Sequence, residues 1–303
     1  MVVARLSRGC VRLLLCCGWW CCRCCASRCC CRSRCCRRVF VACVCPFPCV
    51  RQHSWFKLLN VCVMVERSMV ATYGYFARGQ YAAESFAGSS RVACAWARRG
   101  VPVKALDVSF PFGHDITLLC AHRLLMEQIR RGYYGALHFG VPCRTCSRAR
   151  NPPLRSTARP WGLSGLGFVQ RCQVREANRV YIRFLQLLAV AFACGVPCCV
   201  GSPNASILWS MLEWRHFVYR DVITDYCQWG TPWRKATRFR FFNVPPGRVA
   251  AIARRCSGRR GRCSRTKMRH VVLRGRLGGR NLTSIAEPYP EGLASALAAV
   301  LVP

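Results

Sequence analysis

Acidic residues are scarce in this sequence: among 303 residues, 11 Asp and Glu stand against 47 Lys and Arg, for a net charge of +36. Lysine is scarce as well, so arginine carries almost all of the positive charge. This excess favours a polyanionic partner, nucleic acid above all, and disfavours an acidic protein substrate. Arginine suits phosphates and guanine edges, although GC-rich coding produces the same bias.

Uninterrupted apolar runs long enough to span a membrane are also missing. The stretch 184–212 is uncharged, but Gly195, Pro197 and Pro203 divide it into helix, turn and strand. We therefore expect no transmembrane helix and no membrane partner. The pattern also excludes collagen-like and coiled-coil architectures.

The N-terminal 69 residues differ in composition from the rest. Sixteen of the 27 cysteines lie within residues 1–62, and no acidic residue precedes Glu66. The cysteines lack the loop spacing of a disulfide framework and the pair spacing of a zinc knuckle, and the apolar piece at 11–22 is too short to cross a bilayer. We interpret residues 1–69 as a leader that is disordered, spuriously translated or used for targeting, with metal or lipid chemistry as a further alternative.

Residues 70–303 have the pattern of an α/β domain. Short apolar runs alternate with amphipathic stretches, which is typical of βαβ units in a mostly parallel sheet. The predicted strands are 81–86, 103–108, 135–139, 197–200 and 222–226. Apolar residues at intervals of three and four predict helices at 91–98, 120–131 and 174–194.

Small residues follow the first predicted strand. The run Ala87-Gly88-Ser89-Ser90 precedes a helix, where a ligand can approach backbone N–H groups. Asp107 lies 19 residues beyond Gly88 at the end of the next strand, which is the place of a ribose-hydroxyl acceptor. Asp115 follows at the start of the third unit. Capping of helices and turns explains the same residues equally well.

A cysteine follows the strand predicted at 135–139. Cys143 is expected at the carboxyl edge of the sheet, where α/β folds bind ligands. Three arginines lie in the next seven residues, and we expect them to lower the pKa of this thiol and to hold phosphates. The pattern predicts a nucleophile, with a structural free thiol or a Cys143–Cys146 metal pair as alternatives.

A set of motifs in the region 80–301 resembles the DNA (cytosine-5) methyltransferases in order and spacing. The motifs are Phe86-Ala87-Gly88, Asp107, His114-Asp115-Ile116, Gly140-Val141-Pro142-Cys143 with Ser147, Trp229-Gly230-Thr231-Pro232-Trp233-Arg234-Lys235 with Arg238, and Pro290 with Leu293.

This resemblance implies the class I methyltransferase fold, a Rossmann-like, mostly parallel sheet of seven strands with helices on both faces. It implies methyl transfer from S-adenosylmethionine to carbon 5 of a cytosine rotated out of DNA. In that chemistry a thiolate adds to carbon 6 and a carboxylic acid binds the ring nitrogen. The implied catalytic residues are Cys143, Arg234 and Arg238, and the implied cofactor-binding residues are Phe86, Gly88, Asp107, Asp115 and Pro142.

The sequence departs from the family at the catalytic acid. Gly201 stands where the family has glutamate, and Ser90, Trp233 and Glu287 replace a family glycine, glutamine and asparagine. Because general acids contribute about 10²- to 10⁴-fold, we expect crippled or absent catalysis. The alternatives are a non-catalytic nucleic-acid-binding protein on the same scaffold and the product of a decaying mobile element.

A second resemblance concerns a Pro-Pro loop. The run Asn151-Pro152-Pro153-Leu154 is similar to the Asn-Pro-Pro-aromatic loop of amino-methyltransferases, but it lacks the aromatic residue that stacks on the target base. A stiff loop explains it as well.

An arginine-rich insert at about 240–282 stands where the family has a larger target-recognition domain. Within it, six residues separate Cys256 from Cys263 and Cys263 from His270, and Cys227 is a candidate fourth ligand. Thiolates with an imidazole suit tetrahedral zinc, which makes zinc a second candidate cofactor, with unpaired thiols as the alternative.

Nucleic acid is the expected partner, DNA rather than RNA, and a DNA-directed activity would place the protein in the nucleus. The predicted nucleic-acid-binding residues follow the cysteine of the fourth motif: Arg144, Arg148, Arg150 and Arg155.

Overall fold

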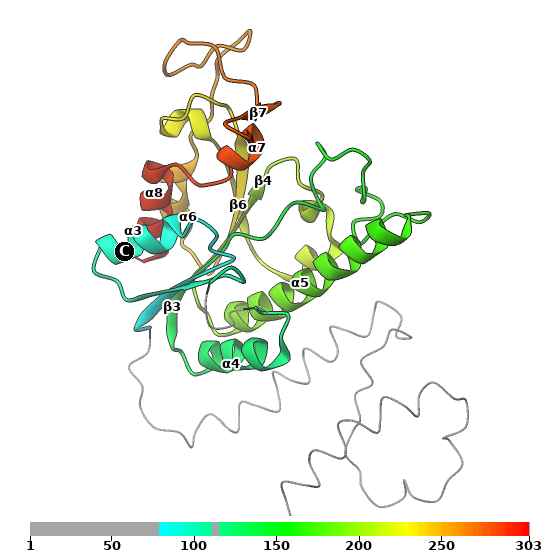
Figure 1. The fold of residues 1–303 in the computed structure, drawn as a ribbon. Helices are drawn as coiled ribbons and strands as arrows, with labels where there is room; N and C mark the ends of the chain where they lie inside the picture. The colour runs from blue at the N-terminus through cyan, green and yellow to red at the C-terminus, as the bar shows by residue number, and fades with distance from the viewer. Residues whose placement is uncertain (1–78, 111–114, 303) are drawn as a thin grey trace, which may run out of the picture. The chain divides into compact units, whose positions relative to one another are not determined.

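A computed structural model describes residues 79–110 and 115–302, which form a three-layer α/β unit (Figure 1). One twisted sheet lies between two groups of helices. The leader predicted at 1–69 and His114 of the third motif lie outside the described residues, so the predictions made for them stay predictions.

Six strands form the main sheet in the order β2-β1-β3-β4-β6-β5. The parallel neighbours are β1 (Tyr81–Ser85), β2 (Val103–Leu106), β3 (Tyr134–Phe139) and β4 (Cys198–Pro203). β6 (Ala236–Phe242) runs antiparallel between β4 and β5 (Arg220–Asp225). Since β2 and β3 flank β1 on opposite sides, the strand order reverses there, and open α/β sheets bind ligands at the carboxyl edge beside such a reversal.

The α/β class is confirmed, but the sheet differs from the prediction in two ways. The described residues contribute six strands to it rather than seven, and β6 is not among the predicted strands. Phe239 and Phe241 of β6 pack on one face of the sheet, while Arg240 and Phe242 pack on the other. A strand that is covered on both faces is normally recognised by a continuous apolar run. Arg238 and Arg240 interrupt that run in β6, so the sequence does not indicate a buried strand there.

Two helices cover each face of the sheet. α4 (Leu119–Arg130) and α5 (Phe168–Ala193) lie on one face, and α3 (Arg91–Arg98) and α8 (Glu291–Leu301) lie on the other (Figure 1). α5 begins at Phe168 rather than at the predicted residue 174. Phe168 and Val169 are exposed, so the apolar period that predicts the helix does not extend to its first turn. No described helix is long and apolar enough to cross a membrane.

Shorter elements connect and extend this framework. They are η3 (Ile207–Ser210), η4 (Leu212–His216), η5 (Tyr226–Trp229), α6 (Pro246–Val249), η6 (Ala250–Ile252), β7 (Arg276–Leu277), β8 (Arg280–Asn281) and α7 (Leu282–Ile285). β7 and β8 form a separate two-stranded hairpin within the insert.

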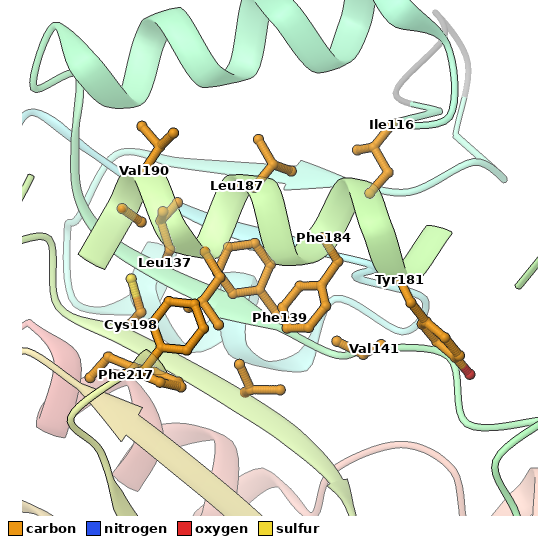
Figure 2. Close-up of a cluster of buried hydrophobic side chains, with 14 of the residues drawn as sticks. Ile116, Leu137, Phe139, Val141, Tyr181, Phe184, Leu187, Val190, Cys198 and Phe217 are labelled. Carbon is orange, nitrogen blue, oxygen red and sulfur yellow. The ribbon is translucent and has the colours of Figure 1, made fainter. Parts of the chain in front are cut away.

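Aromatic side chains fill the core beneath α5. The ring of Phe184 packs edge-on against that of Phe139 with centroids 5.3 Å apart, and both are fully buried (Figure 2). Each such side chain contributes about 1.5–3 kcal/mol by leaving water. One turn along α5, the Tyr181 hydroxyl donates to the Pro142 carbonyl at 2.8 Å. The core thereby fixes the segment that carries Cys143.

Candidate functional site

The loops that leave β1 and β3 touch at the reversal of strand order. Gly140 N–H donates to the Ser85 carbonyl at 3.0 Å, and a Cβ on Gly140 would lie 2.9 Å from the Phe86 carbonyl oxygen. Only glycine permits this approach. Phe86 and Gly88 have φ of 58° and 46°, so the chain turns sharply into α3 and leaves Gly88 exposed. These two predicted cofactor-binding residues therefore lie at the mouth of the expected crevice.

Glu84 caps the first turn of α3 from within the sheet. Its Oε2 accepts the Ala93 N–H at 2.6 Å, where the helix dipole favours an anion. Burial nevertheless raises the pKa of Glu84 to about 7. Glu84 is not among the predicted residues, and an acid inside an apolar strand is the signal that marks it in the sequence.

Asp107 hydrogen-bonds the glycine turn and also caps the turn that follows β2. Its Oδ2 accepts the Gly88 N–H at 2.9 Å, and its Oδ1 accepts the N–H and the hydroxyl of Ser109 at 2.9 and 2.6 Å. Burial acts to raise the pKa of Asp107, but these hydrogen bonds outweigh it and lower the pKa below its usual value. Asp115 instead caps a turn, since its Oδ1 accepts the Thr117 N–H at 2.8 Å.

Cys143 is a half-buried thiol at the carboxyl edge of the sheet. Burial raises its pKa, and the cation that opposes this effect is Lys235. The expectation that neighbouring arginines lower the pKa of Cys143 is therefore wrong. Arg144 is exposed, and Arg150 donates to Gln173 Oε1 at 2.7 Å.

The two arginines predicted as catalytic each pair with another side chain. Arg234 Nε lies 3.4 Å from Asp225 Oδ1, and Arg238 donates to Asn204 Oδ1 at 3.1 Å. Arg238 lies in β6, whereas Arg234 and Lys235 precede that strand. The structure places Lys235, which lies between these arginines, within electrostatic reach of Cys143.

Tyr289 fills the space beside Gly201. A Cβ on Gly201 would overlap the Tyr289 hydroxyl and lie 2.8 Å from Phe239 Cε1. The Tyr289 hydroxyl also shares a hydrogen bond with His138 Nε2 at 3.2 Å. Burial raises the pKa of Tyr289 well above its usual range and lowers that of His138 to about 3, so both groups are neutral. A glutamate at 201 would require the tyrosine to move.

Arg155 is a structural residue, which corrects its predicted role in nucleic-acid binding. It is only 4% exposed, and its guanidinium donates to the Pro160 carbonyl at 2.7 Å and to Asn178 Oδ1 at 2.8 Å. Its guanidinium carbon also lies 5.1 Å from the centre of the Tyr181 ring. A buried and fully engaged arginine does not offer its charge to a phosphate.

Two of the other predicted nucleic-acid-binding arginines line a pocket. Arg144 and Arg150 line it together with Arg179 of α5, and its volume is about 300 Å³. Arg148 is exposed on the same loop. Guanidinium groups with one nearby carboxylate, Glu176, give this pocket a net positive charge that suits a phosphate.

The four predicted metal ligands meet in one cluster. Their candidate ligand atoms, in Cys227 of η5 and in Cys256, Cys263 and His270 of the insert, all lie within 4.8 Å of one another. Backbone and hydroxyl groups of Ser264 donate to Cys256 Sγ at 3.4 and 3.5 Å. Burial acts to raise the pKa of Cys256, but these hydrogen bonds outweigh it and lower the pKa.

This chain is similar to two solved methyltransferase structures. The S. pombe Dnmt2 methyltransferase shares 12% identity at a TM-score of 0.37, with coverage of 61% of this chain and 58% of that chain. The Entamoeba histolytica methyltransferase EhMeth shares 11% identity at a TM-score of 0.33, with coverage of 55% of this chain and 54% of that chain. The chain thus spans little more than half the length of each. No family model and no curated protein matches it.

Proposed function

We propose that residues 79–302 form a divergent methyltransferase-like domain that binds S-adenosylmethionine and acts on, or binds to, nucleic acid. The observation that carries this proposal is the Asp107–Gly88 hydrogen bond of 2.9 Å. It joins the ends of β1 and β2 at the reversal of strand order, so a backbone turn and an ionised carboxylate meet where a nucleoside would bind. The order of the motifs over 80–301 is the reason for proposing S-adenosylmethionine as the methyl donor and the class I methyltransferase fold for the domain.

In this proposal Cys143 is the nucleophile toward carbon 6 of cytosine. The thiol follows β3 directly, and the core fixes its loop through the Tyr181–Pro142 hydrogen bond of 2.8 Å. Lys235 is the cation that favours its thiolate. Because Gly201 supplies no carboxylic acid and Tyr289 lies beside it, we expect weak activity or none.

The first experiment separates cofactor binding from chemistry. S-adenosylmethionine binding is measured by equilibrium dialysis for the parent chain and for Asp107→Asn, with Glu127→Gln of α4 as the matched control. Tritiated methyl transfer to duplex DNA, single-stranded DNA and RNA is then measured for the parent and Cys143→Ala. The proposal is supported if the parent chain binds the cofactor and Asp107→Asn weakens that binding while Glu127→Gln does not. Methyl label that appears with the parent chain and is lost in Cys143→Ala establishes Cys143 as the nucleophile. A folded parent chain that binds no cofactor refutes the proposal.

A second candidate is a nucleic-acid-binding protein that keeps the fold without catalysis. It is favoured by the occupied Gly201 position and by the raised pKa of Cys143. It predicts tight, salt-dependent binding that does not respond to cofactor. If Arg144 contacts a phosphate, Arg144→Gln should reduce the magnitude of the slope of log affinity against log salt concentration by about 1, because one phosphate contact is lost. Arg99→Gln is the matched control, because Arg99 follows the C-terminal end of α3, at the opposite edge of the sheet.

A further inference from the structure

The insert after β6 has almost no hydrophobic core of its own. In the described part of the chain, Cys227, Cys256 and Cys263 form a buried cluster by themselves, with exposed fractions of 1%, 4% and 3%. Between residues 226 and 286 the sequence has no acidic residue, while arginines are frequent. A short basic segment of this kind gains little by burying apolar surface, so another interaction must hold it in place.

The loop around these cysteines is tightly built. A Cβ on Gly258 would overlap the Arg262 carbonyl and lie 2.8 Å from Ser264 N. Cys263 N–H donates to the Met268 carbonyl at 2.7 Å, and His270 N–H donates to the Gly261 carbonyl at 2.8 Å. These bonds turn the chain so that two sulfurs and the imidazole approach Cys227 on η5. Three thiolates and one imidazole are a complete tetrahedral ligand set for zinc.

The same loop is fastened to the end of β5. Asp225 is fully buried, and its Oδ2 accepts the Cys256 N–H at 2.7 Å and Arg255 Nε at 3.0 Å. A second attachment joins Val271 N–H to the Pro232 carbonyl at 2.9 Å. The insert therefore holds the segment 226–235 near both of its ends.

We propose that Cys227, Cys256, Cys263 and His270 bind one structural zinc ion, which fastens the insert to η5 and so fixes the segment that carries Lys235. The zinc takes no part in the methyl transfer proposed above. With Ser264 as the group that orients Cys256 Sγ, the site has both its ligands and an outer hydrogen-bonding partner. The zinc proposal rests on the ligand cluster alone and does not depend on whether the domain is an active methyltransferase.

The first test counts zinc in the full chain by mass spectrometry of the metal. The N-terminal cysteines are common to all variants, so differences between variants report the cluster. Cys263→Ser and Cys256→Ser should each carry one zinc fewer per chain than the parent, and His270→Cys should keep it, because a four-thiolate site also binds zinc. Cys172→Ser, which changes a free cysteine of α5, is the control and should match the parent.

Two further measurements identify the ion and its effect. Cobalt loading should give thiolate-to-metal absorption that is lost in Cys263→Ser and kept in Cys172→Ser. Zinc should slow amide exchange at 225–235 and 256–270, while β1 and β3 exchange equally in the parent and Cys263→Ser. Equal zinc content in the parent and both serine variants overturns the proposal. So does iron in place of zinc, or a disulfide between Cys256 and Cys263 in the purified chain.

Discussion

The crowding of Gly201 by Tyr289 makes a quantitative prediction for Gly201→Ala. The new Cβ would overlap the Tyr289 hydroxyl and lie 2.8 Å from the buried ring of Phe239. Overpacking of this kind costs about 1–3 kcal/mol, while replacing a strand glycine by alanine recovers about 0.5–1 kcal/mol. The net loss of unfolding free energy is therefore at most about 2.5 kcal/mol, or up to about 10 °C in Tm for a domain of this size.

The cause of this loss is tested by a double-mutant cycle read by urea unfolding. Tyr289→Phe alone removes the hydrogen bond to His138 and should cost about 0.5–1.5 kcal/mol. It also removes the overlapping oxygen, so the double variant should be more stable than the sum of the single losses predicts, by about 1 kcal/mol. Gly247→Ala is the control, because no atom lies near its added Cβ. Additive losses, or a stabilised Gly201→Ala, would refute the proposed overlap.

Three further predictions concern Glu84, Asp225 and Gly258. The pKa of Glu84 is raised from 4.5 to about 7, so its contribution to stability is full below pH 4.5 and is lost as the pH rises through 7. The urea midpoint of the parent chain should therefore fall over this pH range, and Glu84→Gln should remove the fall. The same pH profile in both chains would contradict this prediction. Asp225→Ala leaves the Cys256 N–H unpaired and should lower the free energy of unfolding in urea by about 1–3 kcal/mol. Asp225→Asn retains an acceptor and should lower it less. Equal losses in the two variants would contradict the role of this hydrogen bond. Gly258→Ala should weaken zinc retention in dialysis against a chelator, unlike Gly247→Ala, and equal retention would show that the loop tolerates the side chain.

The layered fold follows from the sequence because its signals are local. The strand and helix patterns give β1 to β5 and α3 to α5, since apolar residues repeat with the periods of those elements. β6 is missed for a physical reason. Arg240 is buried there because Asp221, opposite it in the register, forms two hydrogen bonds with it at 2.7 and 2.8 Å. A pairing across 19 residues cannot be read from periodicity.

The candidate site shows the same division. The closeness of Gly88 to Asp107, and that of the four candidate metal ligands to one another, agrees with groupings that residue type and spacing indicate, while their roles stay predictions. The choice among Arg234, Lys235 and Arg238 depends on the partners that each side chain meets in the folded chain, and a motif spacing does not fix those partners. The place of Arg155 depends on acceptors at Pro160 and at Asn178 of α5, and the place of Tyr289 depends on its packing beside Gly201.

The packing of α8 against α3 has a consequence for how the protein is made. Trp96 Nε1 donates to the Ala298 carbonyl at 3.2 Å across 202 residues of sequence, and Arg98 pairs with Glu291. One face of the sheet, including Ala82 and Ala136, is covered by α3 and α8 together, so its cover is complete only after α8 has left the ribosome. At about 5–20 residues per second, that apolar surface stays exposed for about 10–40 seconds after α3 is synthesised. During translation this face is the part of the domain that a chaperone would bind.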